Sequence, residues 1–491
     1  MKIIYYDIDS QRPDHLGVYG YHRPTSPNID VFSKDALVFD NVYVSDSPCL
    51  PSRTALFTGR FGIKTGVVGH GGTAADPFIE GPTRGFGSKL GRTSWVRLLR
   101  NAGLWTASVS PFAERHAAWH FCANWNEQIN TGKRGLETAD EIVPNALEWM
   151  KRNQHRDDWF LHINVWDPHT PYRAEEKYFD AFKDSPLPSW PNKDTLQEHL
   201  KGCGPHSASE ATGFGPAGSD YKTLFPKQPD VIDSESALRQ LFDGYDAGVR
   251  AADDWFGEIL KTCRSLGIED DVAIIISGDH GENLGELNIY ADHMTADSVT
   301  PHVPMIIKWP GKTDGLSGQH FKALHYQFDI AATTAEWLGQ EIPDNWSGRS
   351  IASTLAAQTD RGRDALVLSH GAWTCQRSSL WEEQNELWLC MKTTHDGFHG
   401  FPKTMLFNVT QDPRLEFEIS KNKSTQTQKG LNLISDWEAT QLSSSDRGDP
   451  LHTVISEGGP KHTKGALPEY LARLRTTGRG HWADHLEAEH G

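Results

Sequence analysis

Short apolar segments alternate with longer amphipathic segments through the first two-thirds of this chain of 491 residues. The strand-like segments are residues 2–8, 105–109, 159–165, 272–277 and 303–309. The helix-like segments are residues 27–37, 51–58, 94–102, 139–153 and 234–266. Alternation of this kind is typical of α/β domains. The order therefore predicts a large, mostly parallel central sheet that is flanked by helices.

The sequence changes character after residue 360. Five segments beyond it resemble strands or helices, namely residues 365–369, 387–393, 404–408, 431–442 and 468–475. Because the chain is too long for one ordinary domain, we expect an α/β domain over residues 1–360. A smaller subdomain over residues 361–491 would combine a short antiparallel sheet with helix. Residues 193–228 are rich in Gly, Pro, Ser and Lys, which predicts a long insertion or lid loop.

The net charge of −17 makes nucleic acid and anionic membrane surfaces poor partners. An anionic small substrate would have to be attracted by a few local charges. No apolar run is long enough to span a membrane. The first ten residues enter a strand directly and lack the features of a signal peptide. We therefore expect a cytoplasmic protein, or a periplasmic or secreted one if a leader precedes this sequence.

Ionisable residues follow two of the expected strands. Asp7 and Asp9 stand two apart at the end of residues 2–8 and so point to the same side. Asp279 and His280 follow residues 272–277. Each group alone would suit a turn or a helix cap, but carboxylates at the carboxyl ends of two strands favour a shared cation.

Cys49 lies at the start of an expected helix, since Pro51 suits the first turn of a helix. The amide groups of a helix N-terminus favour anions, and Arg53 lies one turn further along. These residues leave two interpretations open. Cys49 is either a reactive thiol of lowered pKa or a buried cysteine in a helix cap. The other five cysteines are scattered and form no CxxC pair.

The segment from Cys49 to Arg60 reads CLPSRTALFTGR. It resembles the signature C-x-P-S-R-x(4)-T-G-R of type I sulfatases, which belong to the alkaline phosphatase superfamily. Residues 9–17, 166–172 and 277–281 are similar to further blocks of that family, and the resemblance covers roughly residues 1–420. It implies that a maturation enzyme oxidises Cys49 to Cα-formylglycine.

The resemblance also implies a divalent metal held by Asp9, Asp279, His280 and an oxygen of the modified Cys49. Ser10 stands where the family carries a second adjacent Asp. Asp7 is a candidate for the missing carboxylate, with a structural role as the alternative. Oxygen-rich ligands suit Ca²⁺ best, and the imidazole also admits Mn²⁺ or Mg²⁺.

The catalytic residues implied by the resemblance depart from the family at several positions. Arg53 would brace the nucleophile and the sulfate, and His169 would contact the sulfate or the leaving oxygen. A family lysine is replaced by His293, and a Lys–His pair after residues 105–109 is absent. The candidates for these catalytic or substrate-binding roles are Arg115, His116, His293 and His70. The family expectation leaves His162, His302 and His325 as structural.

The implied reaction is hydrolysis of a sulfate ester. One hydroxyl of the hydrated formylglycine attacks sulfur, and the second allows sulfate to be expelled. Seventeen tryptophans suit stacking on sugars, so a sulfated carbohydrate is the expected substrate, with Trp373, Trp381 and residues 395–399 as candidate wall residues. A phosphonate monoester or phosphodiester hydrolase of the same superfamily is the alternative, and a non-catalytic sulfated-glycan binder is a third reading. The sequence leaves a homo-oligomer open.

Overall fold

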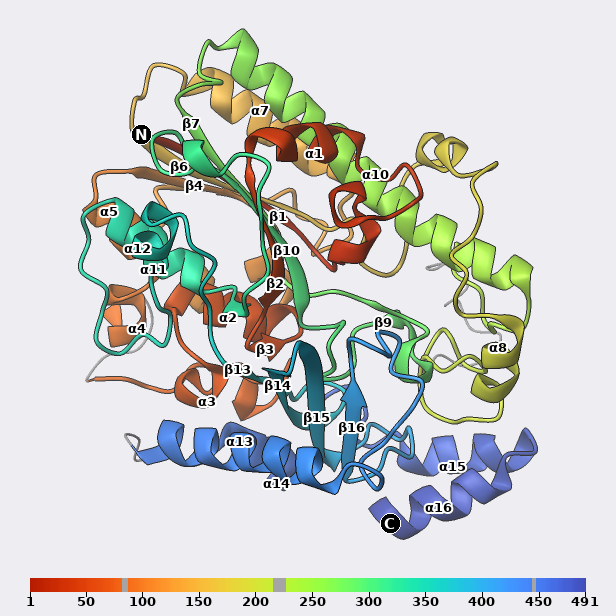
Figure 1. The fold of residues 1–491 in the computed structure, drawn as a ribbon. Coiled ribbons are helices and arrows are strands. Elements are labelled where there is room, and N and C mark those ends of the chain that lie inside the picture. The colour runs from red at the N-terminus through yellow and green to blue at the C-terminus, as the bar shows by residue number, and fades with distance from the viewer. Residues whose placement is uncertain (82–86, 215–226, 444–446) are drawn as a thin grey trace.

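A computed structural model describes residues 1–81, 87–214, 227–443 and 447–491. Its centre is a sheet of nine strands, in which β11, β2, β10, β7, β1, β6, β4 and β5 follow in order and β12 pairs with β2 (Figure 1). Only β10 runs antiparallel to its neighbours. The strands are β1 Lys2–Ile8, β2 Leu37–Tyr43, β4 Trp105–Val109, β5 Glu127–Ile129, β6 Trp159–Val165, β7 Val272–Gly278, β10 His302–Lys308, β11 His320–Phe321 and β12 His325–Tyr326. The predicted mostly parallel α/β sheet is confirmed.

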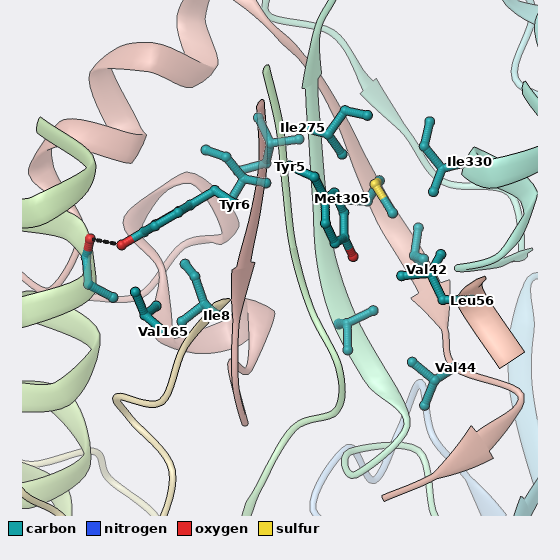
Figure 2. Close-up of a cluster of buried hydrophobic side chains, with 14 of the residues drawn as sticks. Tyr5, Tyr6, Ile8, Val42, Val44, Leu56, Val165, Ile275, Met305 and Ile330 are labelled. Carbon is teal, nitrogen blue, oxygen red and sulfur yellow. Dashed lines mark hydrogen bonds between the residues drawn. The ribbon is translucent and has the colours of Figure 1, made fainter. Parts of the chain in front are cut away.

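Strand β1 is central because both of its faces are apolar. Tyr5 packs edge-on against Trp95 on one face, with ring centroids 5.5 Å apart. Tyr6 points to the other face, where its hydroxyl donates to the carbonyl oxygen of Ala252 at 2.8 Å (Figure 2). All seven residues of β1 are buried, as a parallel strand covered on both sides requires.

Helices cover both faces of the sheet (Figure 1). One face carries α1 Pro27–Phe32, α7 Ala139–Arg152 and α10 Glu235–Ser265. The other carries α2 Cys49–Thr58, α5 Trp95–Asn101, α11 Asp329–Trp337 and α12 Ala352–Ala356. Shorter elements in the loops are α3 Gly62–Thr65, α4 Lys89–Arg92, α6 Phe112–Arg115, α8 Lys193–His199, β8 Asn283–Leu284 and β9 Tyr290–Asp292.

A second sheet has five strands in the order β16, β15, β14, β13 and β3. Its antiparallel strands are β13 Ala365–His370, β14 Cys375–Glu383, β15 Glu386–His395 and β16 Thr404–Asn408. Strand β3, Asp46–Ser47, pairs parallel to β13 and comes directly before Cys49. The helices of this region are α13 Ser424–Ser443, α14 Pro450–Ser456, α15 Leu467–Thr476 and α16 Gly480–His490. The smaller antiparallel sheet is confirmed, and the boundary at residue 360 stays a prediction.

The structure differs from the sequence predictions at several elements, and two of the differences have a clear physical reason. The helix expected over residues 27–37 ends at Phe32, and Leu37 already begins β2. Strand β14 was not predicted, because its centre from Gln376 to Ser379 is polar although it is buried. Part of the insertion expected over residues 193–228 lies outside the described residues. No described helix combines the length and the apolar composition that crossing a membrane needs.

Candidate active site

The carboxyl ends of β1 and β7 bring two carboxylates together. Ile8 pairs with Gly278 in register, so Asp9 and Asp279 emerge side by side. One nitrogen of Arg53, Nη1, donates to Asp9 Oδ2 at 2.9 Å and to Asp279 Oδ2 at 2.6 Å. The two carboxylates predicted at the strand ends therefore lie side by side, and the guanidinium of Arg53 bridges them.

Arg53 lies deep in the protein, and its guanidinium packs over the ring of Phe112 at 4.7 Å. Burial opposes the charged form, but Asp279, Asp7 and Asp9 hold the pKa of Arg53 well above its ordinary value. The guanidinium therefore stays charged. Its Nη2 atom is buried without a hydrogen-bond partner among the described residues. A buried donor without a partner is costly, so this nitrogen is available for a ligand oxygen.

Cys49 is the first residue of α2 and contacts His280. The Cys49 Sγ lies 3.1 Å from His280 Nε2, and His280 Nδ1 donates to the carbonyl oxygen of Gly281 at 2.8 Å. The lone pair on Nε2 therefore faces the sulfur. One potential ligand atom from each of Asp9, Cys49, Asp279 and His280 lies within 4.8 Å of the others. Burial, and then His293, lower the pKa of His280 to about 3, so the imidazole is neutral and can act as a ligand.

The Cys49 thiol is poorly suited to be a nucleophile in its unmodified form. Burial, and then the charges of Asp9 and Asp279, raise the pKa of Cys49 well above its ordinary value. Reactive cysteines need the opposite shift. Of the two readings left open by the residues alone, the reactive thiol is therefore not supported.

Asp7 does not join the four potential ligands. Its Oδ2 accepts hydrogen bonds from Arg53 Nε at 2.9 Å and from His162 Nε2 at 3.1 Å. Sequence reasoning placed Asp7 on the correct side of the strand, and Arg53 lies between it and the other carboxylates. His162, expected to be structural, holds Asp7 from the neighbouring strand β6.

His169 is positioned by a close approach of two chain segments. The loop after β6 packs against α10 at Gly244 and Gly248, where a Cβ atom would lie 2.6 Å from Tyr172 Cδ2 and from Pro168 Cα. A larger residue at either glycine would push the loop away. The loop places His169 Nε2 4.0 Å from Asp9 Oδ1 and the His169 ring 5.1 Å from that of His293. His169 is therefore at the edge of the predicted site.

His293 stands beside His280, with ring centroids 4.2 Å apart. Its Nδ1 is 3.8 Å from Asp292 Oδ1 and 4.0 Å from Glu282 Oε2. Burial alone would lower the pKa of His293, but Asp292 and then Glu282 raise it above its ordinary value. At the position of the family lysine, His293 thus keeps a proton more readily than an ordinary histidine.

This shift predicts the pH dependence of activity. We expect kcat/KM to fall as His293 loses its proton at high pH. Asp292→Asn removes the main group that raises the pKa of His293, so the fall should begin at lower pH. His293→Lys keeps its charge to about pH 10, so the fall should begin at higher pH. The measurement is a pH profile of kcat/KM for each protein with the same cation, and a fall at one common pH would contradict the assignment.

Two further histidines lie on the other side of Cys49. The rings of His70 and His116 are 4.8 Å apart, and each offers a nitrogen within 4.8 Å of the Cys49 sulfur. His70 Nε2 faces the amide of Leu50 at 3.5 Å. This arrangement assigns the His70 proton to Nδ1, which lies 3.1 Å from His462 Nε2. The structure thus brings both predicted histidines to the site and adds His462.

Cys49 lines a cavity of about 670 Å³. Its lining contains predicted and unpredicted side chains: Cys49, His70, Arg115, His116, Arg134, Leu136, His169, Thr170, Pro171, His206, Thr212, Gln228, Asp292, His293, Trp373, Lys461 and His462. Trp373 was expected in the wall, whereas Trp381 is buried in a cluster under the small sheet. Sequence reasoning missed His206, Asp292, Lys461 and His462. Of these, Asp292 had a signal, because it adjoins the predicted His293.

Comparisons with known proteins identify the family and the fold of the chain. The model of the sulfatase family matches residues 3–340. The chain is 21% identical to an arylsulfatase of Clostridium perfringens over 458 residues, which is 84% of this chain and 89% of the relative. It is 24% identical to the iduronate 2-sulfatase of Homo sapiens over 395 residues, which is 72% of this chain and 68% of the relative.

Two solved structures share the fold. One is a protein in complex with its substrate D-glucosamine-2-N,6-O-disulfate, with a TM-score of 0.70, 16% identity, and coverage of 91% of this chain and 98% of that one. The other is the phosphonate monoester hydrolase of Agrobacterium radiobacter, with a TM-score of 0.67, 16% identity, and coverage of 90% and 96%. At these identities the likeness shows the fold alone.

Proposed function

Because this chain belongs to the sulfatase family, we propose that it hydrolyses sulfate esters of a carbohydrate, with a nucleophile made from Cys49 and a bound divalent metal. The observation that carries the proposal is the buried group of Asp9, Asp279 and His280 around the Cys49 sulfur, at the floor of a cavity. Its relatives include an arylsulfatase, an iduronate 2-sulfatase and an ulvan-active sulfatase.

The residues fit a hard divalent cation. Asp9 and Asp279 offer carboxylate oxygens, and His280 offers a neutral imidazole nitrogen. Burial, and then the neighbouring charge of Asp9, raise the pKa of Asp279 against the effect of Arg53. The two carboxylates therefore repel each other, which a cation would relieve. This donor set suits Ca²⁺ first, and Mn²⁺ or Mg²⁺ next. Such a cation lowers the pKa of a bound hydroxyl group and neutralises charge on the ester.

The side chains around Cys49 would stabilise charge on the transferred group, contact the leaving oxygen and bind the sugar. Arg53 and protonated His293 would stabilise negative charge on the transferred group, because Arg53 bridges Asp9 and Asp279 and His293 packs against His280. His169, at the edge of the site, would contact the transferred group or the departing oxygen. Its Nδ1 donates to the carbonyl oxygen of Thr170, and burial lowers its pKa well below the ordinary value, so the neutral ring would need to gain a proton before it could serve as a general acid. Trp373 offers a ring in the cavity wall on which a sugar would stack.

Hydrolysis of phosphonate monoesters is the second candidate, because a phosphonate monoester hydrolase shares the fold. His70 occupies the position where related phosphonate hydrolases carry an asparagine. Its Nε2 accepts from the amide of Leu50, so His70 alone does not distinguish the two anions. A non-catalytic glycan binder is less well supported, because binding alone would not need an oxidisable cysteine within 3.1 Å of His280.

Two aryl esters test the proposal. The protein is co-expressed with a formylglycine-generating enzyme, and conversion of Cys49 is verified by peptide mass. We then compare kcat/KM for an aryl sulfate and an aryl phosphonate monoester that share one leaving group, before and after removal of divalent cations by a chelator. We expect a preference for sulfate that is lost with the cation. A preference for phosphonate would select the second candidate, and no turnover by converted, metal-loaded protein would support the binder.

A further inference from the structure

The cavity above Cys49 is cationic, although the whole chain carries a net charge of −17. Three of its lining residues, Arg115, Arg134 and Lys461, are basic, and Asp292 is the only acidic one among the described lining residues. Asp292 is in turn held by His206 Nε2 at 3.1 Å. The volume of about 670 Å³ lies in the range of sites that enclose a whole small molecule. The cavity therefore has room and positive charge beyond the needs of one sulfate group.

Arg115 belongs to the part of the cavity near the nucleophile. Its guanidinium stacks over Trp166 at 5.0 Å, and its Nε is buried without a partner among the described residues. It is also one of the charges that lower the pKa of the Cys49 thiol. Arg115 would thus supply charge to the sulfate that reacts. Arg134 Nε lies 4.0 Å from Glu114 Oε1, which leaves Lys461 as the basic lining residue with neither an ion-pair partner among the described residues nor a role.

Lys461 comes from the loop between α14 and α15, well beyond the residues that match the family. The next residue fixes the loop: the amide of His462 donates to the carbonyl oxygen of Ala372 at 3.1 Å, and its ring stacks on Trp373 at 4.6 Å. The aliphatic part of Lys461 lies over Gly71, where a Cβ atom would be 2.6 Å from Lys461 Cδ. The loop therefore holds the lysine at the cavity wall.

The charge at this wall is that of Lys461 itself. Loss of contact with water on the cavity side lowers the pKa of the adjacent His462, although part of its side chain is exposed, and it lowers the pKa of half-buried His70 well below its ordinary value. Both imidazoles are therefore neutral near pH 7. Lys461 is exposed at the cavity wall, and none of the ion pairs among the described residues involves it. An amino group that faces a cavity without a carboxylate partner is available to an anionic ligand.

We propose that Lys461 forms a second anion-binding position, so that the substrate carries a sulfate or carboxylate group in addition to the sulfate that is hydrolysed. The inference rests on the proposed sulfatase function. It assigns the C-terminal segment a part in substrate selection, because Lys461 approaches the ester from a segment outside residues 3–340.

The test compares an aryl sulfate with two analogues that carry an added carboxylate or a second sulfate on the ring. We would measure kcat/KM at about 0.15 M salt, where charges beyond about 8 Å are screened. Lys461→Met should lower kcat/KM for both doubly charged esters by about tenfold and should leave the singly charged ester within about twofold. Lys461→Arg should retain the preference. The analogue with the larger loss identifies the group that the lysine binds.

Lys464→Met is the matched control, because Lys464 lies in the same loop and does not line the cavity. It should leave all three esters unchanged. An equal loss for singly and doubly charged esters in Lys461→Met, or no loss at all, would overturn the second anion-binding position and leave the sulfatase proposal intact. Failure of the converted wild-type protein to hydrolyse any of the sulfate esters would overturn the function on which the inference rests.

Discussion

Cys49→Ser should lose steady-state hydrolysis of an aryl sulfate by at least about 10³-fold. A serine hydroxyl at the start of α2 has the position to attack, but it lacks the second hydroxyl that lets the hydrated formylglycine release sulfate. The physical setting agrees, since burial and two carboxylates raise the pKa of the unmodified Cys49 thiol. The measurement is kcat for wild-type and variant proteins, both co-expressed with the maturation enzyme.

Cys122→Ser provides the control for loss of a cysteine. Cys122 is half-buried at the end of a short turn and is not among the cavity-lining residues. We expect this variant to keep the wild-type kcat. Turnover of Cys49→Ser at the wild-type rate would disprove the formylglycine mechanism, and wild-type protein that is active while peptide mass shows unmodified cysteine would disprove it independently.

Arg53→Leu should be the most damaging substitution for stability. Arg53 is shared by Asp7, Asp9 and Asp279, and all four side chains are buried. Removing one partner of a buried ion pair costs about 3 to 5 kcal/mol, because a charge is left without compensation. We expect a loss of this size in the free energy of unfolding in urea, measured with a chelator present, together with loss of activity.

The same variant separates the role of Asp7 from that of the other carboxylates. Ca²⁺ should stabilise Arg53→Leu more than it stabilises the wild-type protein, because binding adds to stability by mass action. Asp7→Asn combined with Arg53→Leu should recover stability and keep the response to Ca²⁺, since Asp7 lies outside the four potential ligands. Arg250→Leu, which removes a partly exposed ion pair with Asp254 and a hydrogen bond to the carbonyl oxygen of Pro24, should cost only about 1 kcal/mol. Unchanged stability of Arg53→Leu would refute the central role of this arginine.

The elements that the sequence predicts best are those whose neighbours are apolar. Strands β1, β4, β6 and β7 are mostly apolar, and nearly all of their residues are buried. Strand β2 was missed because Asp40 and Asn41 interrupt it, both half-buried where the strand lies. Strand β14 was missed because it buries Arg377, which is paired with Asp449 at 2.6 Å and Glu438 at 2.8 Å. Partners so distant along the chain leave no local pattern.

The site residues also fall into a group that the sequence predicts and a group that it does not. Asp9, Asp279, Cys49 and Arg53 are predictable, since strand ends and a helix start fix where they lie and the resemblance names their roles. Lys461 and His462 are not, because no motif marks them and His462 meets His70 across 392 residues. The role of Asp7 was also beyond the sequence. The sequence leaves Asp7 either as a metal ligand or as a structural residue, and the structure shows Arg53 and His162 bonded to its carboxylate.

The burial of α2 has a consequence for the order of events during synthesis. Every residue from Cys49 to Thr58 is buried in the folded protein. A second enzyme therefore cannot bind this segment as an extended peptide once folding is complete. Cys49 packs against His280 in the folded protein. Asp279, which precedes His280, is synthesised 230 residues after Cys49. That separation takes roughly 10 to 50 s at common rates of translation. If Cys49 is the oxidised residue, that interval is when the oxidation has to occur, and a chain that folds first keeps its thiol.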